Sequence, residues 1–144
     1  MLLEYFSLFL LSFGAATVIP IGSEPLFTYM LASGGDASSL VATATIGNWF
    51  GGLTTFALGY FGKWERASKI LRIDPVKAEK WRKKVVDKGT WFAIWCWTPF
   101  VGDIIAFALG LARANPMTVS VFMLTGKFLR YLFIALTLEG FSRL

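Results

Sequence analysis

Residues 98–105 read TPFVGDII and lie inside an apolar stretch, with TWFAIWCW before them and AFALGL after them. Proline removes a helical hydrogen bond and glycine lowers helix propensity. A carboxylate such as Asp103 costs roughly 3 kcal/mol or more at bilayer depth. A second stretch, IPIGSEP at residues 19–25, has the same features. Both stretches indicate helices that break at depth, beside an acid.

The composition is that of an integral membrane protein. The 144 residues are 56% hydrophobic and 17% aromatic, and the mean hydropathy is +0.60. A soluble domain of this length cannot bury so much apolar surface, so we expect a single membrane domain, residues 1–144. The N-terminus lacks a basic segment, which disfavours a cleavable signal peptide.

No enzyme activity is expected from this chain. The sequence has no histidine, which removes the commonest general base and metal ligand. It also has no G-x-S-x-G serine motif and no cluster of metal ligands. We therefore expect no catalytic residue, no metal and no cofactor.

Positive charge is concentrated in one segment. Ten of the fourteen Lys and Arg residues fall between Lys63 and Lys88. The positive-inside rule favours a cytoplasmic segment, residues 63–89, over nucleic-acid binding. We expect two short amphipathic helices here, with Trp64 and Trp81 toward the membrane and lysines toward anionic headgroups. A solvated linker is the alternative. Asp74 followed by proline predicts the start of the second helix.

Four apolar blocks cover the rest of the chain. A spanning helix needs about 20 apolar residues, and the uninterrupted blocks 37–62 and 116–141 qualify. Blocks 1–33 and 90–111 are interrupted and fit re-entrant helical hairpins. A kinked transmembrane helix is the alternative for block 90–111. The expected hairpin breakers are Pro20, Gly22, Pro25, Pro99 and Gly102.

The landmarks of the two halves recur at one offset. Four pairs of residues lie 79 positions apart: Pro20 and Pro99, Glu24 and Asp103, Asp36 and Asn115, Gly47 and Gly126. We read two repeats, residues 1–62 and 90–144, each a hairpin plus one span. Because a hairpin returns to its own side and a span crosses, the repeats are inverted. Both termini then lie opposite the cytoplasmic segment.

The candidate site combines the two deep acids with two deep cations. Lys127 and Arg130 lie three residues apart on one face of block 116–141. We expect Glu24 and Asp103 to pair with them across the repeats, around a wet cavity that holds an anionic headgroup. The alternative is that the acids only cap helix starts. Gly126 permits close helix approach.

Four motifs carry a family resemblance: PIGSEP (20–25), ATIGNWFGGLT (44–54), WTPFVGDII (97–105) and GKFLRY (126–131). They resemble the DedA superfamily, whose shared region is called the VTT or SNARE-associated Golgi domain, and its short YqaA-like branch in particular. The resemblance implies paired re-entrant hairpins and a role in moving lipids between leaflets. Polyprenyl phosphates and glycerophospholipids are proposed substrates of the superfamily, with proton coupling in some members.

The resemblance also assigns residues. The acid of the family's first hairpin matches Glu24. Longer members often carry an acid in a G-D-x-x-G-Y motif, where this chain has Asn48. We expect Asn48 to belong to the substrate-binding residues, with Lys127, Arg130, Glu24 and Asp103. Longer members place arginines around the proline of the second hairpin, where this chain has Asp103.

The expected function is translocation of a phosphate-bearing lipid in a bacterial inner membrane. Lys127 and Arg130 would bind the phosphate, and Glu24 and Asp103 would neutralise them in the empty state. A proton-coupled ion or small-molecule transporter and a structural or assembly protein are the alternatives. Two spans and two hairpins hardly enclose a cavity, so a homodimer is expected.

Overall fold

The computed structural model describes residues 2–17, 22–63, 74–92, 95, 98 and 101–142, with side chains left out at some positions. Pro20, Pro99, Trp64 and the side chain of Trp81 lie outside what is described. The helices are α1 (Leu2–Ala15), α2 (Glu24–Ala32), α3 (Ala37–Phe61), α5 (Pro75–Phe92), α6 (Val101–Leu111) and α7 (Pro116–Ser142). The described residues contain no strand, and the all-α prediction is confirmed.

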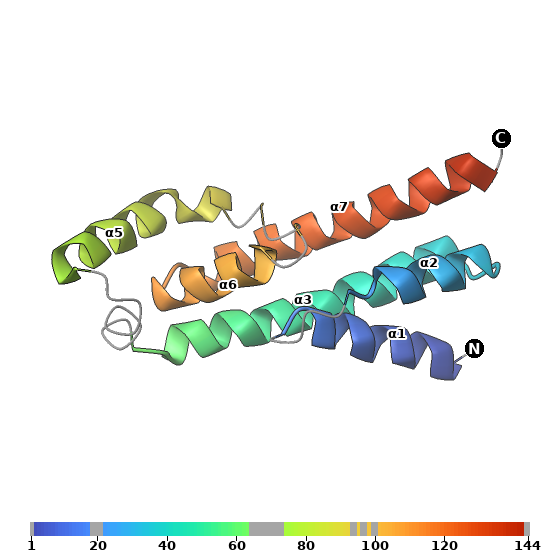
Figure 1. Ribbon diagram of the computed structural model, residues 1–144, viewed down its shortest axis with the longest axis horizontal. Helices are drawn as coiled ribbons and strands as arrows, with labels where there is room; N and C mark the ends of the chain where they lie inside the picture. The colour runs from blue at the N-terminus through green and yellow to red at the C-terminus, as the bar shows by residue number, and fades with distance from the viewer. Residues whose placement is uncertain are drawn as a thin grey trace.

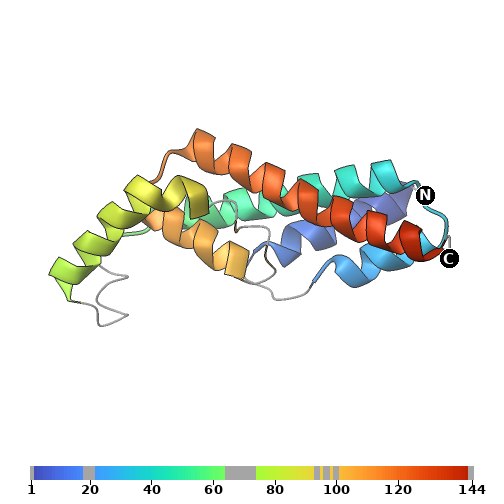
Figure 2. The same ribbon diagram turned by 90° about the horizontal axis from the view of Figure 1, so that it is seen from above.

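The helices form an elongated bundle whose two halves run in opposite senses (Figures 1 and 2). Helices α1 and α3 run away from the end that carries both termini, and α2 runs back toward it. Helix α5, which covers most of the linking segment, runs toward that end; in the second half α6 runs away from it and α7 runs toward it. The chain therefore reverses its direction between α5 and α6.

Helix α3 is the centre of the bundle, and α1, α6 and α7 pack against it. Glycines allow this close approach. A side chain at Gly51 would collide with the carbonyl oxygen of Phe13 on α1. On α6, a side chain at Gly110 would collide with the carbonyl oxygen of Phe56 on α3. The backbones of neighbouring helices thus touch where glycines recur.

Two apolar clusters lie along the bundle. The first joins α1, α2, the start of α3 and the end of α7 around Leu8, Phe27 and Tyr131. The second joins the end of α3 with α6 and the start of α7 around Phe56 and Met123. On α7, the residues between Met123 and Tyr131 bridge the two clusters.

Both long helices begin at the polar residues expected from the sequence. Asp36 is the N-cap of α3, and its Oδ2 accepts hydrogen bonds from the Ser39 amide at 2.9 Å and the Ser38 hydroxyl at 2.7 Å. Asn115 Oδ1 accepts from the Met117 amide at 3.0 Å at the start of α7. Side-chain oxygens satisfy amides that a helix start leaves unpaired.

One described helix, over residues Pro116–Gly140, is long and apolar enough to cross a membrane by length and composition. The second expected span, α3, is a continuous helix of 25 residues but does not reach the same apolarity. Glycine, threonine and asparagine residues are buried along it. A helix that is covered by its neighbours needs less apolar surface than a helix that faces lipid.

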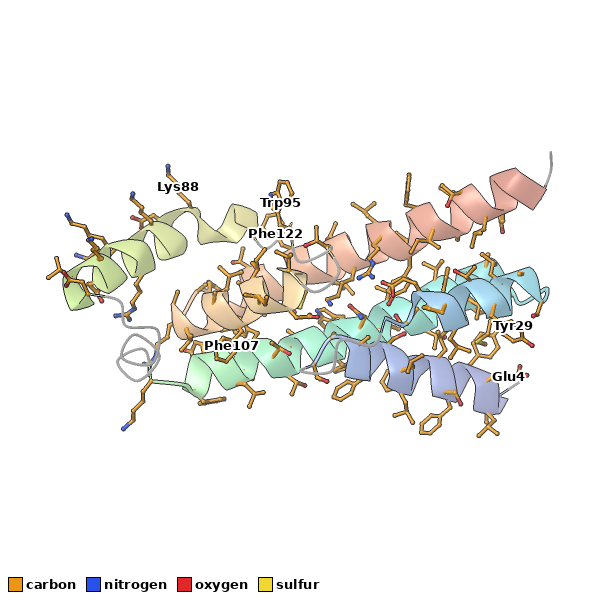
Figure 3. The ribbon with its side chains drawn as sticks, viewed as in Figure 1. Glu4, Tyr29, Lys88, Trp95, Phe107 and Phe122 are labelled. Atoms are coloured by element: carbon orange, nitrogen blue, oxygen red, sulfur yellow. The ribbon has the colours of Figure 1, made fainter. Side chains whose placement is uncertain are left out.

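Helix α5 begins as predicted, because Asp74 Oδ1 accepts a hydrogen bond from the Val76 amide at 2.9 Å. It continues to Phe92, so residue 90, where the sequence places the start of the third apolar block, lies inside this helix. Its lysines are exposed, and Lys88 points away from the bundle (Figure 3).

Candidate functional site

Two basic side chains, one buried and one largely buried, lie on α7 between the two apolar clusters. Lys127 is only 2% exposed, and the Arg130 side chain is 12% exposed. They lie less than one turn apart and so share a face of the helix. Buried cations are tolerated only when they are paired and hydrogen-bonded.

Glu24 neutralises Arg130. The carboxylate forms an ion pair with the guanidinium, joining α2 of the first half to α7 of the second. Glu24 is the first residue of α2, and Pro25 follows in the first turn. An acid is favoured there by the helix dipole and by free amides. Helix capping alone does not account for Glu24, because its carboxylate also meets a cation.

Asp103 pairs with Lys127. Lys127 Nζ lies 3.7 Å from Asp103 Oδ1, and the aspartate side chain is 20% exposed. Both residues belong to the second half, so the expectation that each acid pairs across the repeats is wrong for Asp103. The reason is that α7 returns antiparallel beside the short α6, which brings Asp103 level with Lys127.

Asn48 joins the two long helices at matched positions. Lys127 Nζ donates a hydrogen bond to Asn48 Oδ1, and the two residues lie 79 positions apart. Asn48 Nδ2 donates to the carbonyl oxygen of Ser12 on α1 at 3.0 Å. The amide thus binds the ammonium with its oxygen and anchors itself to α1 with its nitrogen. The four ionic residues, Glu24, Asp103, Lys127 and Arg130, are called the charge cluster below.

Sequence reasoning missed a second buried polar contact beside the charge cluster. The hydroxyls of Ser23 and Tyr131 lie 2.5 Å apart, and both residues are at most 1% exposed. The ring of Phe27 packs on Tyr131 at 5.3 Å between centroids. Ser23 and Tyr131 each adjoin a charged site residue in sequence, which is the signal that could have identified them.

Two buried hydroxyls near Asn48 lack a hydrogen-bond partner among the described residues. They are Ser12 Oγ and Thr45 Oγ1, on residues 0% and 3% exposed. Thr45 precedes Asn48 by three residues on α3, and Ser12 already bonds Asn48 through its carbonyl. Buried hydroxyls of this kind are satisfied by water or by a polar ligand group. The side chain of Asn48 therefore lies near two buried hydroxyls that need a water molecule or a polar ligand group.

Two expected hairpin breakers do not interrupt a helix. Pro25 lies in the first turn of α2, and Gly102 is the second residue of α6. Proline is tolerated in a first turn because the amide there has no helical partner. Gly22 lies just before α2, where an added side chain would collide with the carboxylate of Glu24. Pro20 and Pro99 are outside the described residues.

The charge cluster holds two acids and two cations, so its formal charge is balanced. The cations are the more deeply buried partners, whereas the Glu24 and Asp103 side chains are 28% and 20% exposed. An incoming anion would therefore compete with the acids for the same two cations. Across the described residues, no three acid, histidine or cysteine side chains gather as a metal site.

Comparison with known proteins identifies the family. The chain is 38% identical over 140 residues to the inner membrane protein YqaA of Escherichia coli K12, covering 96% of this chain and 94% of that protein. The same figures hold for YqaA of Shigella flexneri. An uncharacterized protein of Haemophilus influenzae is 32% identical over 134 residues, covering 86% of this chain and 80% of that protein.

No family model and no solved structure matches the chain. The 38% identity to YqaA over nearly the full length is enough to assign the chain to a family. The chain belongs to the family of the inner membrane protein YqaA, a branch of the DedA superfamily.

Proposed function

We propose that this chain translocates a phosphate-bearing lipid between the leaflets of the inner membrane. The observation that carries the proposal is the charge cluster. Lys127 is buried and Arg130 is largely buried, and each is neutralised by an acid from a different short helix. Ionisable residues at membrane depth commonly mark a substrate pathway.

The membrane topology forms part of the proposal. The two repeats, residues 1–62 and 90–144, are inverted. In each, a re-entrant hairpin (residues 1–33 with α1 and α2, and residues 90–111 with α6) is followed by a helix that crosses the bilayer, α3 or α7. The opposite helix directions of the halves support this arrangement (Figure 1). The matched helix starts at Asp36 and Asn115 support it as well. Segment 63–89 is cytoplasmic, and both termini face the other side.

The proposed mechanism is exchange of ion-pair partners. Arg130 presents a planar fork that suits two phosphate oxygens, and Lys127 adds a point charge. Glu24 and Asp103 lie in the first turns of α2 and α6, and the free amides of these turns also favour an anion. When the phosphate binds, Glu24 and Asp103 release their cations. When it leaves, the acids return, and the empty site stays neutral.

Two further functions are compatible with the same cluster. A proton-coupled transporter of an ion or small molecule would show activity that is independent of lipid identity. An assembly protein would use the ion pairs only to hold helices together, and their removal would impair folding. Leaflet exchange in vesicles of defined lipid composition separates all three.

The decisive experiment removes both cations without changing side-chain length greatly. In vesicles containing purified protein, Lys127→Gln with Arg130→Gln should slow leaflet exchange of a fluorescent anionic lipid by roughly tenfold or more, since hydrogen bonds to charged groups contribute about 1.5–3 kcal/mol. Lys127→Arg should keep more activity than Lys127→Gln. The matched control, Lys83→Gln with Lys88→Gln, removes two charges from α5 and should exchange normally. Unchanged exchange by a folded double variant of the cluster would contradict the proposal.

The topology is tested by labelling. Single cysteines at Lys77 and Ser142, in a Cys96→Ala background, should react with an impermeant reagent from opposite sides of the membrane. Reaction from the same side contradicts the inverted repeats.

The proposal also includes a homodimer. Side chains of Glu24 and Asp103 are partly exposed at a depth where exposed charge is costly, and a second copy would cover them. Single-molecule photobleaching in nanodiscs should show two copies. Fully active single copies would contradict this part.

A further inference from the structure

The side chain of Tyr131 on α7 contacts the start of α2 at two points. Its hydroxyl lies 2.5 Å from the Ser23 hydroxyl, and its ring packs on Phe27 with 5.3 Å between the centroids. Ser23 and Phe27 are four residues apart and so share one face of the helix. All three residues are at most 1% exposed. Tyr131 is therefore a buried point on which the first turn of α2 rests.

Ser23 uses its hydroxyl for this contact instead of for its own helix. Serine is among the best residues at a helix start, because its oxygen accepts a hydrogen bond from a free amide. Ser23 is the N-cap residue of α2, yet its side chain makes no capping hydrogen bond. Its hydroxyl meets Tyr131, 108 residues further along the chain. A local stabilisation is thus replaced by a long-range contact, directly before Glu24.

The ring of Tyr131 also supports the cation that Glu24 neutralises. The guanidinium carbon of Arg130 lies over this ring, 5.7 Å from its centroid. Such cation–π contacts are strongest where both groups are removed from water. Arg130 forms its ion pair with Glu24 from this position. Tyr131 thus holds the cation with its ring and, with its hydroxyl, the residue that precedes the acid.

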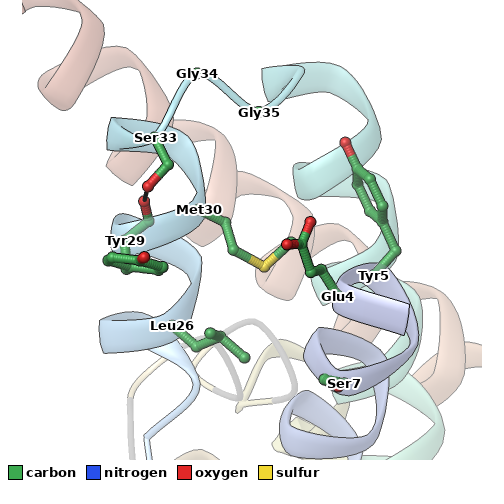
Figure 4. A pocket seen from close by; sticks show the side chains of 9 residues that line it. All are labelled: Glu4, Tyr5, Ser7, Leu26, Tyr29, Met30, Ser33, Gly34 and Gly35. Atoms are coloured by element: carbon green, nitrogen blue, oxygen red, sulfur yellow. Dashed lines mark hydrogen bonds between the residues drawn. The ribbon is translucent and has the colours of Figure 1, made fainter. Parts of the chain in front are cut away.

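Helix α2 is incompletely packed on the side of α1. It packs on α3 and α7, whereas a cavity of about 410 Å³ opens between α2 and the start of α1 (Figure 4). The far end of α2 is fixed by the turn at Gly34, whose φ of +88° is a left-handed conformation that favours glycine. The position of the first turn, and with it that of Glu24, therefore depends on contacts such as those of Tyr131.

The other ion pair of the charge cluster lacks this hydroxyl contact. The positions that lie 79 residues from Ser23 and Tyr131 are Gly102 and Gly52. Glycine has no hydroxyl with which to hold the start of α6 against α3. The acid Glu24 is thus held by a device that has no counterpart beside Asp103.

We infer, on the basis of the proposed function, that Tyr131 is a positioning residue that sets how strongly Glu24 competes with an incoming phosphate for Arg130. Its hydroxyl, through Ser23, holds the first turn of α2 where Glu24 meets Arg130 in the empty state. Its ring supports the guanidinium whether the partner is the carboxylate or the phosphate. Removing the hydroxyl alone therefore weakens the acid and keeps the cation in place, which shifts the equilibrium toward the bound state.

Binding of a short-chain phosphatidic acid tests the inference, by isothermal titration of the purified protein in a neutral detergent. Tyr131→Phe and Ser23→Ala should each bind this probe roughly threefold more tightly than the unaltered protein, since a hydrogen bond no longer favours the empty state. Tyr131→Leu, which also lacks the ring, should bind it roughly threefold more weakly than Tyr131→Phe. A contact that served stability alone would not tighten binding when it is removed.

Thr55→Val is the matched control. The buried Thr55 hydroxyl donates to the carbonyl oxygen of Ala16 at 2.8 Å, so this variant removes a buried hydrogen bond outside the charge cluster. It should lower the melting temperature, as Tyr131→Phe does, and leave the affinity for phosphatidic acid unchanged. Unchanged or weaker binding of the probe by folded Tyr131→Phe would overturn the inference, and so would equally tightened binding by Thr55→Val.

A double-mutant cycle separates the positioning role from the proposed function. Measured as free energy of unfolding, Tyr131→Phe should cost less in a Glu24→Gln background, where the ion pair that the hydroxyl positions is already lost. Such coupling in a protein that does not bind phosphatidic acid would contradict the proposed function and still support the positioning of Glu24 by Tyr131. Strictly additive losses would overturn the inference, whatever the protein binds.

Discussion

Helices α3 and α7 occupy matched places in the two halves, yet their buried faces carry different chemistry. Where α7 has Lys127 and Arg130, α3 has Asn48 and Gly51 at the positions 79 residues earlier. The small residues of α3 admit the backbone of α1. The long residues of α7 reach the acids of α2 and α6. Helix α3 therefore serves packing and α7 serves charge, although the two helices begin 79 residues apart, at Ala37 and Pro116.

The difference follows from their surroundings. Helix α3 is covered by α1, α6 and α7, so side-chain volume is limited along it. Helix α7 keeps a broad exposed apolar face, including Val121, Phe128 and Phe133. Only the side of α7 that faces the bundle needs to be polar. The following substitutions test this division, beginning with the largest expected effect.

Removing the acid that neutralises Lys127 of α7 should cause the largest loss of stability. Asp103→Ala leaves Lys127 buried without its acid and should lower the free energy of unfolding by about 3 kcal/mol. Adding Lys127→Met removes the buried charge that has lost its carboxylate, so the double variant should be more stable than the single one. Chemical unfolding in detergent measures both. Losses that simply add would show that the two residues are not coupled.

Adding volume on the α3 side should be the next largest effect. Gly51→Ala places a methyl group against the carbonyl of Phe13 and should cost about 2 kcal/mol, as overpacking does. Gly140→Ala on α7 is the control, because no atom lies within 4 Å of an added Cβ there. The control should be neutral or slightly stabilising, since alanine is the better helix former. Equal losses at both positions would contradict the packing role of α3.

The hydroxyl pair that ties α2 to α7 should contribute less. Ser23→Ala and Tyr131→Phe should each cost about 1 kcal/mol, the net value of a buried hydrogen bond. The double variant should lose little more than either single variant. A full double-mutant cycle in unfolding free energy measures the coupling. Strictly additive losses would show that the two hydroxyls do not interact.

The smallest effect concerns the two helix starts, which differ in their response to pH. Hydrogen bonds from the Ser38 hydroxyl and from Ser39 hold the pKa of the Asp36 carboxyl below its ordinary value. The stabilisation is present above the unfolded pKa and is lost as pH falls through the folded pKa. Asp36→Asn should retain the cap at neutral pH and reduce the acid sensitivity.

Amide hydrogen exchange at the first turn of α3 measures this difference. The first turn of α7 is the internal reference, because its cap, Asn115, does not titrate. The same acid sensitivity in Asp36→Asn as in the unaltered protein would assign the effect to another group.

The parts of the molecule that could be predicted from the sequence are those set by local chemistry. Asp36 and Asn115 mark helix starts because a side-chain oxygen before an apolar run satisfies free amides. The acids pair with Lys127 and Arg130 because deep charges need partners.

What could not be predicted depends on which helices become neighbours. That α3 is central, that Asp103 pairs within its own half and that Ser23 meets Tyr131 all follow from packing between distant segments. The end of α5, at Phe92, could not be predicted for another reason. Thr90 begins an apolar block, but a change of hydropathy does not end a helix.

The hydrogen bond between Lys127 and Asn48 has a consequence for the ancestry of the chain. If the halves arose by duplication, positions 48 and 127 were once the same residue, facing its own copy across a symmetry axis. Two lysines there would repel each other, and two asparagines would carry no charge. A symmetric ancestor therefore could not place a single paired ammonium at its centre. On the same premise, joining both copies in one gene would allow the two positions to diverge into a donor and an acceptor.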